Sequence, residues 1–177
     1  MKFIIKREEL LPALQAVNGV VERRQALPIL SNLLLSVKKD CITLAGTDME
    51  VELVMKINRE MNDEGETTLP ARKLLDICRA LPEGADISMS IKGGKAQITS
   101  GKSRFTLSTL PAQEYPLADE VESITEFEID QKTLKSLLDR TAFAMAQQDV
   151  RYYLNGLYLE ILGGRLRVVA TDGHRLA

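Results

Sequence analysis

Apolar and polar positions change their spacing along the chain, and each change marks the start or end of a predicted element. The apolar run 3–5 predicts a short strand. Leu10, Leu14 and Val17 then recur at helical spacing after Glu8, whose carboxylate suits the positive N-terminal end of a helix. The first segment therefore predicts a strand followed by an amphipathic helix.

The following apolar runs are short and separated by polar or glycine-containing turns, as in antiparallel hairpins. We expect strands over residues 29–37, 41–45, 51–57, 66–69, 87–91, 96–100 and 104–110. A second helix is expected over 71–81, where Leu74, Ile77, Cys78 and Leu81 share one side. Residues 111–123 are acidic and irregular, which indicates a linker.

The pattern then restarts. At an offset of 124 residues the matching pairs are Phe3/Phe127, Ile5/Ile129, Leu10/Leu134, Leu14/Leu138, Leu44/Val168, Thr47/Thr171 and Asp48/Asp172. The segment 30–32 resembles 153–155 once one residue of slip is allowed. We therefore expect a second strand at 127–129, a helix at 131–145, a loop at 146–151, and a hairpin pairing 157–161 with 166–170.

A repeat of this length is a duplicated domain, because solenoid units are only about 20–50 residues long. Residues 1–122 are expected to form a complete domain, and residues 123–177 the start of a second, in which 54–124 have no counterpart. Each half of the complete copy combines one helix with several short antiparallel strands. This predicts an α+β fold with helices on one face of the sheets.

The composition limits the class of protein. With 177 residues, 45% hydrophobic and 27% charged, the chain is typical of a soluble globular protein. No apolar run approaches the roughly 20 residues of a membrane span, and the first residues become charged too early for a signal peptide. Cys41 and Cys78 have neither metal-type spacing nor a disulfide framework, so a reducing cytoplasm is expected.

The formal net charge of −2 is unusual for a nucleic-acid-binding protein, in which a basic excess is typical. Basic residues nevertheless cluster, as in Arg72 and Lys73, whereas acidic residues collect over 114–128. The asymmetry fits one positive face on an acidic body, and it also fits scattered solvated charge.

Three segments carry candidate chemistry, and the first is the loop 147–153. Arg151 and Gln148 can donate to phosphate oxygens, and Tyr152 and Tyr153 can stack on bases. The alternative is that one tyrosine belongs to the core and the other is an ordinary surface ring.

The second segment is 171–176, which contains His174, the only histidine. Asp172 beside it invites a catalytic hypothesis, because a carboxylate can orient an imidazole, but no nucleophile or metal-ligand set accompanies the pair. Thr-Asp also occurs at Thr47 and Asp48, which favours a turn shared by both copies. Gly173 and its successors occur in copy two alone and are the stronger functional candidates.

The third segment is 102–108. Alternation places Lys102 and Arg104 on one face and Phe105 and Leu107 on the other. The strand is expected either at an exposed edge, where it could pair with another chain, or inside a sheet.

Several segments together resemble the bacterial DNA polymerase III beta subunit family, the replicative sliding clamps. The resemblance covers the whole chain and is carried by residues 28–35 (PILSNLLL), 70–73 (PARK), 103–111 (SRFTLSTLP), 148–156 (QDVRYYLNG) and 170–177 (ATDGHRLA). It implies the DNA-clamp (processivity) fold, with two helices packed on antiparallel sheets per domain and the domain repeated in tandem.

The resemblance also implies a function. Members are non-catalytic processivity subunits without metal or cofactor, which form a head-to-tail homodimeric ring of three domains per subunit around double-stranded DNA. Partners implied are a second clamp subunit, the replicative polymerase, the clamp loader, repair polymerases and mismatch-repair proteins, all but the first docking by short peptides. The implied location is the bacterial cytoplasm, at the nucleoid during replication, with no membrane partner.

Site residues follow from the same resemblance, position by position. The DNA-contacting residues implied are Arg24, Gln148, Arg151, Tyr152 and Tyr153. Those of the peptide-binding pocket are Leu154, Thr171, Gly173, His174, Arg175 and Leu176. Those of the subunit interface are Lys73, Lys102, Arg104, Phe105 and Leu107. The rival hypotheses are a small hydrolase using Asp172 and His174, and a stand-alone nucleic-acid-binding module.

Overall fold

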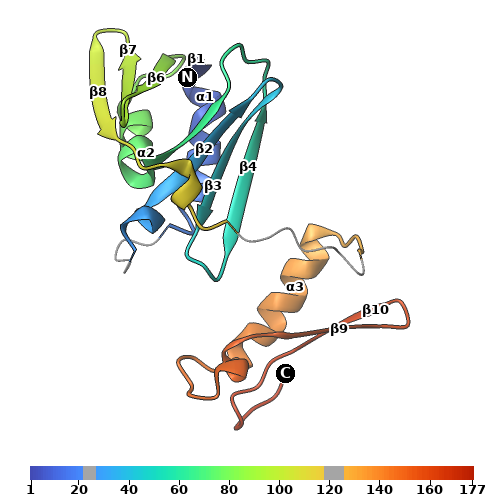
Figure 1. Ribbon diagram of the computed structural model, residues 1–177. Coiled ribbons are helices and arrows are strands. Elements are labelled where there is room, and N and C mark those ends of the chain that lie inside the picture. Colours follow the sequence, from blue (N-terminus) through green and yellow to red (C-terminus); the bar gives the residue numbers. More distant parts are fainter. Residues whose placement is uncertain (22–26, 118–125) are drawn as a thin grey trace. The chain divides into compact units, whose positions relative to one another are not determined.

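The computed structural model describes residues 1–21, 27–117 and 126–177 (Figure 1). The chain divides into two compact units, Met1–Glu120 and Val121–Ala177. The expected boundary between residues 122 and 123 falls in 118–125, outside the described residues.

Unit one contains two four-stranded antiparallel sheets. One has the order β1-β6-β7-β8, formed by β1 (Lys2–Lys6), β6 (Asp86–Lys92), β7 (Lys95–Ser100) and β8 (Ser103–Ser108). The other has the order β4-β3-β2-β5, formed by β2 (Asn32–Lys38), β3 (Cys41–Thr47), β4 (Glu52–Asn58) and β5 (Gly65–Pro70). The strands expected from the apolar runs are thus present, and β8 lies at a sheet edge.

Two helices, α1 (Arg7–Val17) and α2 (Ala71–Ala80), cover these sheets in unit one (Figure 1). Leu10, Leu14 and Val17 of α1 are buried, as their spacing predicts. Leu74 and Cys78 of α2 join the same core, together with residues from both sheets. The α+β clamp fold expected from the sequence is therefore confirmed.

Two expectations for unit one were wrong in detail. Pro28–Ser31 is a 3-10 helix, so β2 begins three residues later than the apolar run suggested. The expected linker also begins too early, because Tyr115 is only 5% exposed. Its hydroxyl group accepts a hydrogen bond from the Thr47 backbone N–H at 3.2 Å and donates one to the Asn32 carbonyl at 3.1 Å. Residues 111–117 are therefore part of the domain.

Unit two repeats unit one at the offset of 124 residues. Helix α3 (Gln131–Thr141) is equivalent to α1, and the 3-10 helix Tyr152–Asn155 is equivalent to Pro28–Ser31. Strands β9 (Tyr158–Leu162) and β10 (Arg165–Val169) form a two-stranded hairpin. Leu159 pairs with Val168 just as Leu35 pairs with Leu44, so the slip allowed in the sequence comparison is unnecessary.

The strand expected at 127–129 is absent, and this expectation was wrong. Its counterpart β1 is held by pairing with β6, and the described part of unit two contains no strand that pairs with residues 127–129. A strand without a partner leaves its backbone groups to water. Phe127 is 53% and Leu159 54% exposed, although their repeat equivalents Phe3 and Leu35 are buried.

Candidate nucleic-acid and peptide interface

The loop after α3 is closed by the side chain of Asn155. Its Oδ1 accepts from the Asp149 backbone N–H at 2.9 Å, and its Nδ2 donates to the Asp149 carbonyl at 3.0 Å. The Asn155 amide thus binds both backbone polar groups of Asp149, as a neighbouring strand would. Gln148, next to it, has a φ of 57°, a left-handed conformation that is rare outside glycine.

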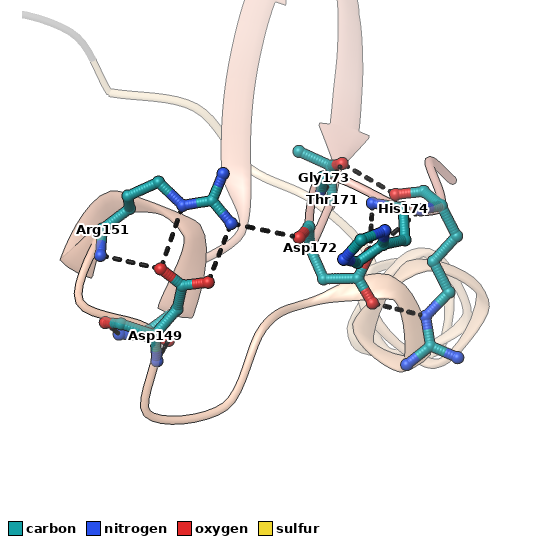
Figure 2. Close-up of polar contacts among 8 residues, drawn as sticks. Asp149, Arg151, Thr171, Asp172, Gly173 and His174 are labelled. Atoms are coloured by element: carbon teal, nitrogen blue, oxygen red, sulfur yellow. Dashed lines mark hydrogen bonds and ion pairs between the residues drawn. The ribbon is translucent and has the colours of Figure 1, made fainter.

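Asp149 and Arg151 form a bidentate ion pair within this loop (Figure 2). Arg151 Nε donates to Oδ1 at 3.0 Å and a terminal guanidinium nitrogen donates to Oδ2 at 2.9 Å. The Arg151 backbone N–H adds a third bond at 2.8 Å. Hydrogen bonds from the Arg151 side chain and backbone lower the pKa of Asp149 to about 2.

The turn 171–175 is built on its threonine and aspartate. Thr171 donates to the Arg175 carbonyl at 2.7 Å, and the Asp172 carboxylate accepts from the His174 and Arg175 backbone N–H groups, both at 2.9 Å. The backbone N–H groups of His174 and then Arg175 hold the pKa of Asp172 below its ordinary value. Gly173 has a φ of 87°. The turn expected from the repeated Thr-Asp pair is confirmed.

These bonds remove the basis of the catalytic hypothesis. One Asp172 oxygen binds backbone N–H groups, and the other pairs with Arg175 Nε at 3.0 Å. The carboxylate therefore orients the turn and a guanidinium group, and the imidazole of His174 is left exposed. A hydrolase dyad needs the carboxylate on the imidazole.

Arg151 brings the loop and the turn together (Figure 2). Its guanidinium donates to the Asp172 carbonyl at 3.5 Å. A Cβ added at Gly173 would lie 3.4 Å from both of its terminal nitrogens, so the guanidinium packs on the glycine. The two segments form the walls of a polar cavity of about 610 Å³, which is lined by residues that include Gln148, Arg151, His174 and Arg175.

The other residues predicted in unit two are not among those that line this cavity. Tyr152 and Tyr153 are 82% and 67% exposed, so the alternative that one of them belongs to the core is wrong. Their rings contact each other edge to face, with 6.0 Å between the ring centroids. Leu154 is half-buried, and Leu176 is 74% exposed. Arg24 lies outside the described residues.

Sequence reasoning missed two residues of this site. The first is Asp149, which forms an ion pair with Arg151. The available signal for this ion pair was an aspartate two residues before an arginine. The Phe143 ring lies 5.9 Å from the Arg175 guanidinium carbon, in a cation–π contact that no sequence pattern indicated.

The residues expected at the subunit interface lie in unit one. Lys102 and Arg104 are exposed at the β8 edge, and Lys73 is exposed on α2. Phe105 is half-buried against the core. Leu107 is only 8% exposed and belongs to the core of its own domain, which limits what it can offer a second subunit.

Within residues 1–21, 27–117 and 126–177, no cluster of three or more His, Cys, Asp or Glu side chains could hold a metal ion. In the same residues, no helix has both the length and the apolar character needed to cross a membrane.

Comparison with known proteins assigns the family. The N-terminal domain of the DNA polymerase III beta subunit matches residues 1–119, and the central domain of that subunit matches residues 128–177. The chain belongs to the DNA polymerase III beta subunit family. The second match begins close to the point at which the internal repeat restarts, at residue 127.

Individual relatives in this family are similar over the whole chain. The beta sliding clamps of Pseudomonas aeruginosa and Escherichia coli are 57% and 52% identical over 100% of the chain. The chain spans about half the length of these relatives, 48% and 49%.

Solved structures of the family agree with the fold. The crystal structure of the Pseudomonas aeruginosa DNA polymerase III beta subunit matches with a TM-score of 0.96 at 55% identity, covering 99% of this chain and 48% of that one. A Caulobacter crescentus sliding clamp matches with a TM-score of 0.93 at 43% identity, over 99% of this chain and 49% of that one. A Pseudomonas aeruginosa clamp has also been solved bound to griselimycin, with a TM-score of 0.93.

Proposed function

We propose that this chain forms part of a DNA sliding clamp, a ring that encircles duplex DNA with a second subunit and tethers the replicative polymerase. The observation that carries the proposal is the tandem match to two clamp domains, together with 52–57% identity to beta sliding clamps over the whole chain. The protein is then a non-catalytic processivity factor that acts in the bacterial cytoplasm at the nucleoid.

The charge of the chain supports a topological hold on DNA. A protein that binds through many phosphate contacts loses affinity steeply with salt and needs a large basic excess. This chain has a net charge of −2, and a closed ring needs cations only where DNA passes. Sequence-independent sliding also needs no base-reading element.

The DNA contacts that we propose are made by Arg24, Gln148, Arg151, Tyr152 and Tyr153. The exposure of both tyrosines supports this, because their hydroxyl groups are available to donate to phosphate oxygens. The strained φ of 57° at Gln148 supports it further, because such strain is concentrated at functional sites.

The peptide pocket that we propose uses Leu154, Thr171, Gly173, His174, Arg175 and Leu176. It would take short peptides of the replicative polymerase, the clamp loader, repair polymerases and mismatch-repair proteins. The polar cavity lined by His174 and Arg175 supports a site with a few polar groups, and Leu176 supplies an exposed apolar side chain in the same segment. Lys73, Lys102, Arg104, Phe105 and Leu107 are proposed for the ring contact.

The ring proposal is tested with a chimaera in which this chain replaces the matching half of the Pseudomonas aeruginosa relative. Loaded on nicked circular DNA by the relative's clamp loader, the chimaera should elute with the DNA and separate from it once the circle is linearised. Equal retention on circular and linear DNA would instead favour a stand-alone nucleic-acid-binding module.

The pocket is tested in the same chimaera with His174→Ala and Leu154→Ala. Each substitution should weaken the binding of a labelled polymerase peptide about fivefold or more, as expected for truncating a central contact. Retention of the chimaera on circular DNA should not change. Glu83→Ala, an exposed side chain of unit one, is the control. Unchanged peptide affinity in both pocket variants would remove the assignment.

A further inference from the structure

The turn of copy one has the same hydrogen bonds as the turn of copy two. Thr47 donates to the Val51 carbonyl at 2.9 Å and accepts from the Met49 N–H at 2.9 Å, as Thr171 does with Arg175 and Gly173 at 2.7 and 3.1 Å. Asp48 accepts from Glu50 and Val51 at 2.9 and 2.7 Å, as Asp172 does from its own successors. One scaffold therefore occurs twice.

The side chains on the two scaffolds differ. Copy two presents Asp172, His174 and Arg175 to a polar cavity. Copy one presents Met49 and Val51 to a cavity of about 300 Å³, whose other lining residues are Thr47, Glu50, Glu52, Pro116 and Leu117. This volume is at the lower end of the range of about 300–1,000 Å³ for ligand pockets. The cavity lies wholly within unit one.

Both walls of this cavity are anchored to one buried residue, Tyr115. The Tyr115 hydroxyl accepts from Thr47 N–H at the base of the turn, and the Tyr115 carbonyl accepts from Leu117 N–H at 3.0 Å in the opposite wall. A cavity whose walls are already ordered loses little conformational entropy when a ligand enters.

The apolar lining faces solvent at a cost in stability. Met49, Val51 and Leu117 are 64%, 53% and 48% exposed. Met49 also has a φ of 75°, where a residue other than glycine is strained by about 1–2 kcal/mol. The strained conformation holds an apolar side chain at the cavity, although the equivalent position in copy two is glycine.

We propose that this cavity is a second peptide-docking site, which takes a short segment of a partner protein with a large apolar side chain next to a lysine or arginine. The apolar side chain would enter between Met49, Val51 and Leu117. The cation is selected by the exposed carboxylate of Glu50 at the rim, and the described lining contains no basic residue.

The site goes beyond the proposed clamp function, because it uses neither the DNA loop nor the His174 cavity. It can be tested in the 177-residue chain itself with the labelled probe peptide Gly-Lys-Leu-Phe-Lys-Gly. The Met49 methyl resonance, assigned through Met49→Leu, should shift on titration. Reversing both lysines of the probe to glutamate, or replacing its two apolar residues by alanine, should each weaken binding about fivefold or more.

Charge exchange provides the decisive comparison. Glu50→Lys should weaken binding of the basic probe and strengthen binding of the acidic one. Glu83→Lys, at an exposed acid of the same unit, should change the affinity for both probes little and equally. Val51→Ser should weaken the basic probe, and Ile4→Ser, at a side chain of similar exposure, should not. A Met49 methyl that does not move at millimolar probe, or equal affinity for the two probes, would overturn the proposal.

Discussion

Arg151 joins two segments of the second unit through one guanidinium group. It pairs with Asp149 in its own loop and reaches the Asp172 carbonyl of the turn. Because arginine presents a planar set of donors, it can make both contacts from one rotamer, which a lysine cannot. The loop proposed for DNA and the turn proposed for peptides are therefore ordered by the same side chain.

The titration of Asp149 tests this arrangement. Its pKa lies at about 2 in place of 3.8, chiefly because Arg151 donates hydrogen bonds to the carboxylate. A lowered pKa means that the ion pair contributes stability above the unfolded value of 3.8 and loses it as pH falls toward 2. Carbon-detected NMR of the carboxyl group should give a midpoint near 2.

Arg151→Gln should move that midpoint back toward the ordinary value, because the charge-assisted bonds are lost. Arg167→Gln, which removes an exposed cation paired with Glu160, should leave it in place. If the midpoint were the same in the wild type and in Arg151→Gln, the ion pair would not form in solution.

At the scale of elements, the segment 110–117 closes the sheet β4-β3-β2-β5 of unit one. Tyr115 bridges the end of β3 at Thr47 and the start of β2 at Asn32. The Thr68 hydroxyl, in β5, also donates to the Leu110 carbonyl at 3.1 Å. The segment thus ties three strands together before the chain leaves the domain.

Tyr115→Phe should lower the free energy of unfolding by about 1–3 kcal/mol, because the Asn32 carbonyl and the Thr47 N–H lose a buried partner. Urea unfolding followed by circular dichroism measures the change. Tyr158→Phe, at a ring that is 61% exposed, should stay within about 0.5 kcal/mol of the wild type. Equal effects of the two substitutions would contradict the bridging role.

At the scale of the whole molecule, a ring needs edges that match. Unit one has a complete pair of sheets, whereas unit two contains one helix and a two-stranded hairpin among its described residues. Among the described residues this hairpin has no further strand at either edge, and Leu162 within it is 71% exposed.

The 177-residue chain alone should therefore not close a stable ring on DNA. Sedimentation velocity with nicked circular DNA should show free protein at physiological salt, under conditions in which the chimaera sediments with the circle. A stable complex of the chain alone that is lost when the DNA is linearised would contradict this expectation.

The sequence by itself determined the elements and their repetition. Leu10, Leu14 and Val17 at helical spacing placed α1, and the alternation over 102–108 together with the family resemblance placed β8. These signals are local, because side-chain period reports which face of an element is buried. The shared Thr-Asp pair likewise determined the turn in both copies, because the aspartate bonds only to its own next residues.

Tertiary structure decided what depends on contacts between distant residues. It buried Tyr115 in a segment that has the composition of a linker, and it left 127–129 unpaired although the sequence repeats β1. It placed Leu107 in the core of its own domain, although the family resemblance implied a role at the subunit interface. It also set Arg151 between Asp149 and the turn at Gly173. Pairing partners, burial and ion pairs depend on which segments meet in space, and no periodicity along the chain encodes that.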